Sequence, residues 1–246
     1  MEELQFFKGY KDESGKYHKT FEITEMTGEV EEQIARKEIK NNGGKVARKI
    51  LELCITRIGD YTREDTKKSL WTQIIQSLDV ADQDYALMKI RQETDGSTIT
   101  VTHKCGDCGK KLNTEIEMDE LELVPYKGID LIPFDMPKKG IKDKNGDYHT
   151  KGFLKRPQGI DREVLAPIFA TNPGKAHTKM LYHCIVSVDG IDVVSEKDIT
   201  NLSLADRKYL DDLLKDNLYG IKQEFTYSCP ECDYEGEGTL NFSSFF

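Results

Sequence analysis

The chain has 246 residues, of which 37% are hydrophobic and 32% are charged, and its formal net charge is −9. This composition is typical of a polar, soluble protein, and the acidic balance disfavours broad binding to a nucleic-acid backbone, which requires a cationic surface. No run approaches the ~20 apolar residues of a membrane span, and the acidic start Met1–Gln5 lacks a signal-peptide pattern, so we expect a reducing, cytosolic compartment.

The first predicted elements are a hairpin and a helix. Ser14-Gly15 is a turn dipeptide of the kind that joins two antiparallel strands. A helix is predicted from about Glu29 to Lys40, with Thr27 as its N-cap and acidic residues in its first turn. The run Asn41–Gly44 is expected to end this helix.

Two more helices are predicted before the first pair of cysteines. One runs from about Lys45 to Ile58, because apolar side chains recur there at helical spacing. These side chains belong to Val46, Ile50, Leu53, Cys54 and Ile58. The other helix begins near the segment Asp79–Asp82.

The first cysteine pair is predicted to lie between two strands. Apolar residues alternate with polar ones before Cys105 and after Cys108, and this period of two indicates strands. The alternating positions are Ile99, Val101, Leu112, Thr114, Ile116 and Met118. Cys105-Gly106-Asp107-Cys108 is therefore predicted to be a metal-binding knuckle at the end of a hairpin.

The second half of the chain repeats the pattern of the first. It has its own turn at Asn145-Gly146, its own helix stop at Asn172–Gly174, and its own cysteine pair, Cys229 and Cys232. Identical residues recur in the same order with few changes of spacing, which indicates an internal duplication. Gly15, Tyr17 and His18 recur as Gly146, Tyr148 and His149; Leu51, Cys54 and Ile55 as Leu181, Cys184 and Ile185; Ala81, Asp82 and Tyr85 as Ala205, Asp206 and Tyr209.

We therefore predict an α+β fold made of two related copies with pseudo-twofold symmetry. Repeat one spans residues 1–121 and repeat two spans residues 141–246, each with a hairpin, helices and a knuckle. The segment 122–140 has no clear counterpart and is predicted to be the linker, because it contains three prolines. They are Pro125, Pro133 and Pro137.

Together the two knuckles supply the four thiolates of a closed structural zinc site, whereas neither half supplies enough alone. We predict that one Zn2+ bound by Cys105, Cys108, Cys229 and Cys232 ties the two halves together. In a reducing compartment, metal binding is favoured over disulfides for these pairs. Opposite charges near the knuckles also favour their pairing: Lys104, Lys110 and Lys111 in the first, Glu231, Asp233 and Glu235 in the second.

Other interpretations of the cysteine pairs are a catalytic zinc, a redox pair, an iron site, or two separate sites completed by other ligands. A catalytic zinc needs an open position, and a thioredoxin-like pair usually opens a helix rather than preceding a strand. Cys54 and Cys184 lie on apolar helical stripes and are predicted to be core residues. His18 and His149 could bind a second ion, but a strand-face role is favoured, and His103 could replace a cysteine ligand.

The sequence contains no Gly-rich phosphate loop and no recognisable nucleophile motif, so we expect no enzymatic activity. The aromatic end, Phe242–Phe246, suggests either an exposed docking patch or a tail folded against the core.

The layout of the chain resembles that of the T4-type baseplate hub and hub-assembly proteins of contractile phage tails, a family also represented in contractile injection systems. The resemblance rests on Phe21–Gly28, the helices around Cys54 and Asp82, the two knuckles, and the ending Phe245-Phe246. The family commonly has a proline where this chain has Gly106.

This resemblance implies a protein without catalytic activity that helps to build the hub of a baseplate. The implied partners are other baseplate hub or tail proteins, and the implied locations are the host cytoplasm during assembly and the virion tail. Only the four knuckle cysteines carry over, as zinc ligands. The alternative is a zinc-ribbon regulator that binds nucleic acid, although the acidic charge disfavours it. The oligomeric state stays open.

Overall fold

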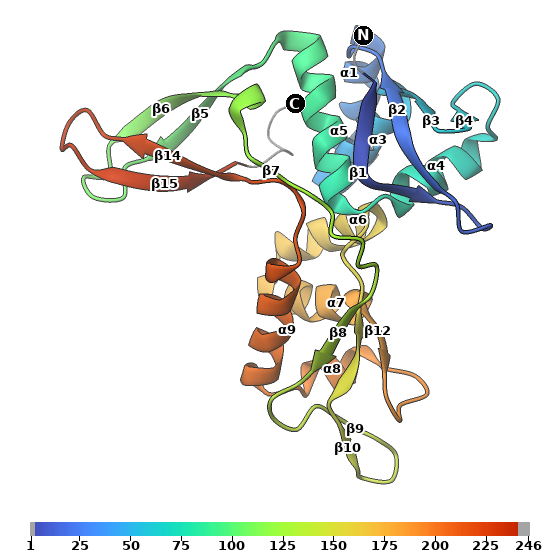
Figure 1. Cartoon of the computed structure of the whole chain (residues 1–246). Helices are drawn as coiled ribbons and strands as arrows, with labels where there is room; N and C mark the ends of the chain where they lie inside the picture. Colours follow the sequence, from blue (N-terminus) through green and yellow to red (C-terminus); the bar gives the residue numbers. More distant parts are fainter. Residues whose placement is uncertain (1–2, 241–246) are drawn as a thin grey trace.

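The computed structural model describes residues 3–240 and has the predicted α+β character, with helices and strands mixed along the chain. Three parts are visible in Figure 1: a first lobe, a second lobe below it, and an arm of two long hairpins that projects to one side. The predicted aromatic end, Phe242–Phe246, lies outside the described residues.

The first lobe packs five helices against a small antiparallel sheet. The strands lie in the order β1-β2-β3-β4, and β1 and β2 form the hairpin predicted at Ser14-Gly15. The strands are β1 Leu4–Lys11, β2 Tyr17–Ile23, β3 Ile55–Ile58 and β4 Tyr61–Thr62. The helices are α1 Gly28–Ile34, α2 Lys37–Lys40, α3 Gly43–Cys54, α4 Lys68–Ser77 and α5 Val80–Asp95.

The core of this lobe is apolar and fully enclosed. Phe6 and Phe21 stack with ring centroids 4.1 Å apart, and the buried side chains of α3, α4 and α5 close over them. Burial of this apolar surface is the main stabilising contribution to the lobe.

Two predicted helices of the first half differ from the observed ones. The helix predicted from Lys45 to Ile58 ends at Cys54, because residues 55–58 form β3 and pair with β2. Ile55 and Ile58 are β-branched and fully buried in this strand. The helix predicted over Glu29–Lys40 is two short helices, α1 and α2. Thr27 is at the N-cap position of α1, but its side chain makes no capping hydrogen bond.

Asn42 and Asn172 begin helices in addition to ending the preceding ones. Each side chain accepts a hydrogen bond from the backbone amide three residues later, Lys45 at 3.1 Å and Lys175 at 3.0 Å. Both residues are therefore N-caps, the role that asparagine fills well because its short side chain reaches that amide.

The second lobe has a three-stranded sheet in the order β12-β11-β8, a small hairpin and four helices. Its strands are β8 Ile132–Asp135, β9 Ile141–Lys142, β10 Tyr148–His149, β11 Lys151–Leu154 and β12 Ile185–Val188. Its helices are α6 Gly159–Phe169, α7 Pro173–Cys184, α8 Glu196–Thr200 and α9 Leu204–Asp216. A separate apolar core, which includes Phe134, Leu181 and Leu210, fills the space between them.

The predicted linker contains two strands that the sequence pattern did not reveal. Within residues 122–140, β7 (Leu123–Val124) pairs with β13 (Gly220–Ile221), and β8 pairs with β11. β7 and β13 lie where the chain passes between the second lobe and the arm (Figure 1).

The arm consists of one hairpin from each half of the chain. The first hairpin is β5 (Thr98–Lys104) with β6 (Lys111–Glu117), and the second is β14 (Glu224–Ser228) with β15 (Glu235–Thr239). The two hairpins share a third apolar core, to which α5 contributes Met88. This arrangement brings the two predicted knuckles to the same end of the arm.

The two lobes contact each other closely where α3 passes α6. Gly44 lies so near the backbone of Arg162 and Glu163 that a Cβ atom at this position would be 2.6 Å from the Glu163 Cα. Asn42 Nδ2 donates to the Glu163 carbonyl at 2.9 Å, and Arg48 Nε lies 2.8 Å from Glu163 Oε1. Glycine at position 44 is therefore needed for the observed approach of the two helices.

Candidate metal centre

Each cysteine pair lies in a tight turn that joins the two strands of its hairpin. The Cys105 amide donates to the Lys110 carbonyl at 2.8 Å, and the Cys229 amide donates to the Tyr234 carbonyl at 2.9 Å. Gly109 (φ 70°) and Asp233 (φ 55°) follow the second cysteine of each pair and adopt the left-handed conformation. The two knuckles thus have the same backbone geometry although their residues differ.

All four predicted ligands converge. The sulfur atoms of Cys105, Cys108, Cys229 and Cys232 lie within 4.8 Å of one another. Cys105 Sγ is 3.7 Å from Cys232 Sγ, and Cys108 Sγ is 3.7 Å from Cys229 Sγ. A disulfide requires about 2.0 Å, whereas tetrahedral zinc with Zn–S bonds of about 2.3 Å separates its sulfurs by roughly 3.8 Å. The sulfur positions therefore fit one tetrahedral metal ion.

The surroundings of the sulfurs favour a bound cation. Burial opposes ionisation of Cys105, but hydrogen bonds from the backbone amides of Cys108 and Asp107 outweigh it and lower the pKa of the thiol to about 7. A backbone amide at Tyr234 donates to the Cys232 sulfur, yet burial and the three neighbouring sulfurs raise the pKa of that thiol to about 12. Four thiolates this close repel one another unless a cation lies between them.

The four cysteines differ in burial. Cys229 is fully buried, Cys105 is nearly so, Cys232 is partly buried and Cys108 is exposed. The Gly106 amide donates to the Tyr227 hydroxyl at 3.0 Å, and this bond crosses from one knuckle to the other. A proline at position 106, as in the family pattern, could not donate this bond.

The knuckles also contact each other through opposite charges, as their sequences predict. The Lys110 ammonium of the first knuckle forms an ion pair with the Glu231 carboxylate of the second. Both side chains are about half exposed, so the pair contributes only modestly to stability but favours the observed pairing of the hairpins.

The remaining candidate ligands have structural roles. Cys54 and Cys184 are fully buried in the two lobe cores, as predicted, and burial raises their thiol pKa values to about 11 and about 12. His18 and His149 pair with Asp12 and Asp143 instead of joining a metal-ligand cluster. His103 Nε2 lies 2.8 Å from Thr114 Oγ1, and within residues 3–240 the knuckle cysteines form the one cluster of potential metal ligands.

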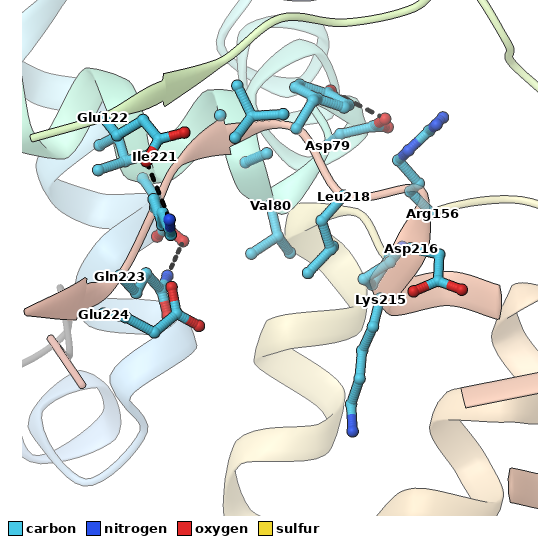
Figure 2. Close-up of a pocket in the computed structure, with 17 residues that line it drawn as sticks. Asp79, Val80, Glu122, Arg156, Lys215, Asp216, Leu218, Ile221, Gln223 and Glu224 are labelled. Carbon is cyan, nitrogen blue, oxygen red and sulfur yellow. Dashed lines mark hydrogen bonds and ion pairs between the residues drawn. The ribbon is translucent and has the colours of Figure 1, made fainter. Parts of the chain in front are cut away.

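A second notable site is a cavity of about 450 Å³ where the arm and the two lobes meet. Its lining includes the apolar residues Val80 and Leu218 together with charged side chains. In Figure 2, Glu122 and Glu224 lie on one side of it and Arg156 on the other.

Arg156 connects the segments around this cavity. Its guanidinium lies 5.4 Å from the ring centre of Tyr126 and 5.3 Å from that of Tyr219. It also donates to the carbonyls of Ile129 and Asn217, at 2.6 and 2.8 Å. These carbonyls belong to the segments that enter and leave the second lobe, so Arg156 joins both by cation–π contacts and hydrogen bonds. No spacing signal in the sequence pointed to this residue.

Buried acids lie beside the same cavity. The Lys8 ammonium is 2.9 Å from Asp79, and the Tyr219 hydroxyl donates to Asp79 at 3.0 Å and to Asp82 at 3.3 Å. Burial is the largest influence on Asp82, and it raises the pKa of this carboxyl to about 6. The acids have partners on the protein itself, which is typical of a structural joint.

Within residues 3–240, the helices are too short or too polar to cross a membrane. A family model described as T4 bacteriophage base plate protein matches residues 13–246. Searches of curated proteins and of solved structures found no match to this chain.

Proposed function

Because this chain belongs to the family of T4 bacteriophage base plate proteins, we propose that it builds or assembles the hub of a contractile-tail baseplate as a zinc-stabilised protein. The observation that carries this proposal is the family match, which spans nearly the whole chain. The family match supports a role in the virion tail, and we propose that assembly takes place in the host cytoplasm. Its partners would be other hub or tail proteins.

We further propose that the metal is one structural Zn2+ held by all four knuckle cysteines. The sulfur spacing of 3.7 Å and the all-thiolate ligand set support zinc, which prefers a closed tetrahedral site of this kind. A closed site leaves no position for water or substrate, so this zinc would stabilise the arm without catalysing a reaction.

The internal repeat is a third part of the proposal. Asp12 Oδ1 accepts from the amides of Ser14 and Lys16, and Asp143 Oδ1 accepts from those of Asn145 and Asp147. In both cases the other carboxylate oxygen contacts the histidine six residues after the aspartate. Such matching detail supports descent of both halves from one ancestral unit.

The structure also suggests a different boundary for the second copy. β8 pairs with β11 in the second lobe as β1 pairs with β2 in the first. We therefore place the start of the second copy at β8, within the predicted linker 122–140, and keep residues 1–121 as the first copy.

Binding of partner proteins without catalysis fits this molecule better than binding of nucleic acid. The net charge of −9 would repel a phosphate backbone, and Lys110 of the first knuckle is already paired with Glu231.

The test is a phage that lacks this gene. Electron microscopy of infected cells should show loss of complete baseplates, and wild-type protein supplied from a plasmid should restore them. A variant with Cys105, Cys108, Cys229 and Cys232 replaced by serine should restore them poorly. Normal numbers of baseplates in the deletion phage would contradict the proposed function.

A further inference from the structure

The outer edges of the two lobe sheets are covered differently. In the first lobe, β4 covers the edge of β3, with Arg57 opposite Thr62 and Ile58 opposite Tyr61. The Arg63 amide extends this pairing by donating to the Thr56 carbonyl at 2.9 Å. The backbone hydrogen-bonding groups at this edge of β3 are therefore paired within the chain.

In the second lobe, the corresponding edge of β12 is largely open. A single bridge joins Val188 to Ile191, and the chain then leaves the edge. In the part of the chain that the structure describes, no amide from beyond the β11–β12 pair donates to the Val186 carbonyl, the counterpart of Thr56. Val186 is 49% exposed, and Val193, on the departing segment, is 79% exposed.

The C-terminal ends of α3 and α7, the helices that precede β3 and β12, differ in the same way: the first is covered and, within the described part of the chain, the second is not. In the first lobe, the Arg63 guanidinium donates to the Leu53 carbonyl in the last turn of α3. His183 is the counterpart of Leu53 in α7, and no side chain among residues 3–240 donates to its carbonyl. The second lobe thus lacks both the covering strand and the cation that follows it.

A cavity occupies the place where those groups would lie. It has a volume of about 390 Å³ and lies between β12, the end of α7 and the segment after Ile191. Its lining residues include Tyr182, His183, Val186 and Val193. β12 itself contains neither lysine nor proline, the residues that commonly protect an edge strand from pairing with other chains.

We propose that the edge of β12 is a docking site that takes an extended segment of another baseplate protein by strand addition. The occupant is a short strand with a β-branched or aromatic residue followed by a cation, because Tyr61-Thr62-Arg63 covers the same edge in the first lobe. Main-chain hydrogen bonds to β12 supply the affinity, and the cation binds the free carbonyl at the end of α7. The inference rests on the proposed function, which supplies the partner.

The probe is a peptide with the sequence of residues 59–65, which contains the first lobe's own covering strand. Added at millimolar concentration to the isotope-labelled full chain, it should shift the amide resonances of β12 and residues 191–194. The peptide with Arg63→Glu should shift them several-fold less. Absence of shifts at β12 would overturn the inference without affecting the proposed function.

Variants of the protein test the same edge in the phage. Val186→Asp with Val193→Asp should abolish the peptide shifts and reduce complete baseplates at least tenfold. Its melting temperature should stay at the wild-type value, because both side chains are exposed. Leu204→Asp, an 84% exposed position in the same lobe, is the control and should behave as wild type. If the deletion phage loses baseplates but the double variant does not, the docking inference is wrong and the proposed function stands.

Discussion

Asp82 and Asp206 accept hydrogen bonds from backbone amides at equivalent positions of the two lobes. Asp82 accepts hydrogen bonds from the amides of Phe7 and Gly9, both at 2.8 Å. Asp206 accepts them from the amides of Lys138 and Gly140, at 2.9 and 3.3 Å. Both carboxylates are fully buried. Each aspartate therefore joins this backbone segment of its lobe to a helix that occurs much later in the chain.

Replacement of either aspartate should destabilise its own lobe. Asp82→Ala removes the acceptor of the Phe7 and Gly9 amides, and the loss of these hydrogen bonds to a charged group costs about 3–5 kcal/mol in total. Asp206→Ala should cost a similar amount, and urea unfolding followed by tryptophan fluorescence and circular dichroism measures both. The single tryptophan, Trp71, reports on the first lobe alone. A change confined to the circular dichroism signal is therefore expected for Asp206→Ala if the lobes unfold separately.

The raised pKa of Asp82 predicts a pH dependence of stability. Burial raises this pKa from 3.8 to about 6, so the folded protein binds the proton more tightly than the unfolded chain does. The contribution of Asp82 to the free energy of unfolding should therefore fall as pH rises from about 4 to about 6, by on the order of 3 kcal/mol. Unfolding of the wild type and of Asp82→Asn should be compared across this range.

Only the difference in unfolding free energy between the wild type and Asp82→Asn reports on Asp82, because other acids titrate in both proteins. Asp130, for example, has its pKa held at about 2: burial opposes this, but hydrogen bonds from Tyr126, Tyr17 and Lys11 prevail. The wild type should lose stability relative to Asp82→Asn as pH rises. An unchanged difference from pH 4 to pH 7 would mean that Asp82 keeps an ordinary pKa.

The fold class and the hairpins could be predicted because their signals are local. Turn dipeptides and alternating apolar residues indicate β1–β2 and β5–β6 without help from distant segments. The strand β15 has no apolar residue, so the hairpin β14–β15 was indicated by the repeat of the first half. The strand β3 was missed because its apolar residues continue the helical spacing of α3. Its pairing with β2, a tertiary contact, decides between helix and strand.

The convergence of the four knuckle cysteines could be predicted because the pair repeats, whereas the joint between the lobes could not. Two equivalent Cys-x-x-Cys pairs indicated a shared site even though Cys105 and Cys229 are far apart in the sequence. Arg156 binds two backbone carbonyls and two aromatic rings from separate segments. Contacts of this kind leave no periodicity or spacing in the sequence.

Loss of one knuckle cysteine should release the metal. Native mass spectrometry of the wild type should show one zinc per chain, and Cys229→Ser should show much less than one. The arm should then become accessible to protease while the lobes stay folded, because their cores do not include the knuckles. Cys184→Ala is the control: it removes a buried thiol outside the site and should keep one zinc. One zinc in Cys229→Ser, bound as tightly as in the wild type, would contradict a four-cysteine site.

The ion pair between Lys110 and Glu231 should affect pairing of the knuckles more than overall stability. Lys110→Glu places two acids side by side and should lower zinc affinity, with a loss of under about 1 kcal/mol in stability. The double variant Lys110→Glu with Glu231→Lys should restore the wild-type affinity. Competition with a chelator at low and at high salt measures the effect, which should shrink as salt screens the charges. Equal affinity of the single variant and the wild type would show that the pair is dispensable.

Gly44 and Gly174 occupy matching positions at the start of α3 and α7, yet only Gly44 lies against another helix. A Cβ at position 44 would be 2.6 Å from the backbone of Glu163, whereas at position 174 the nearest atom is Asn172 Oδ1 at 3.6 Å. Gly44→Ala should therefore force α3 and α6 apart and destabilise the protein by about 1–3 kcal/mol. Gly174→Ala should be neutral or stabilising by up to about 1 kcal/mol, because alanine favours the helix.

Urea unfolding of the two glycine variants measures this difference, and small-angle X-ray scattering shows whether the lobes of Gly44→Ala have moved apart. The helix propensity gained is the same in both variants, so their difference in stability isolates the contact between the lobes. Equal effects of the two substitutions would mean that α3 and α6 do not pack closely in solution. The lobes would then be held together by the Arg156 joint and by the paired hairpins of the arm rather than by direct packing of α3 on α6.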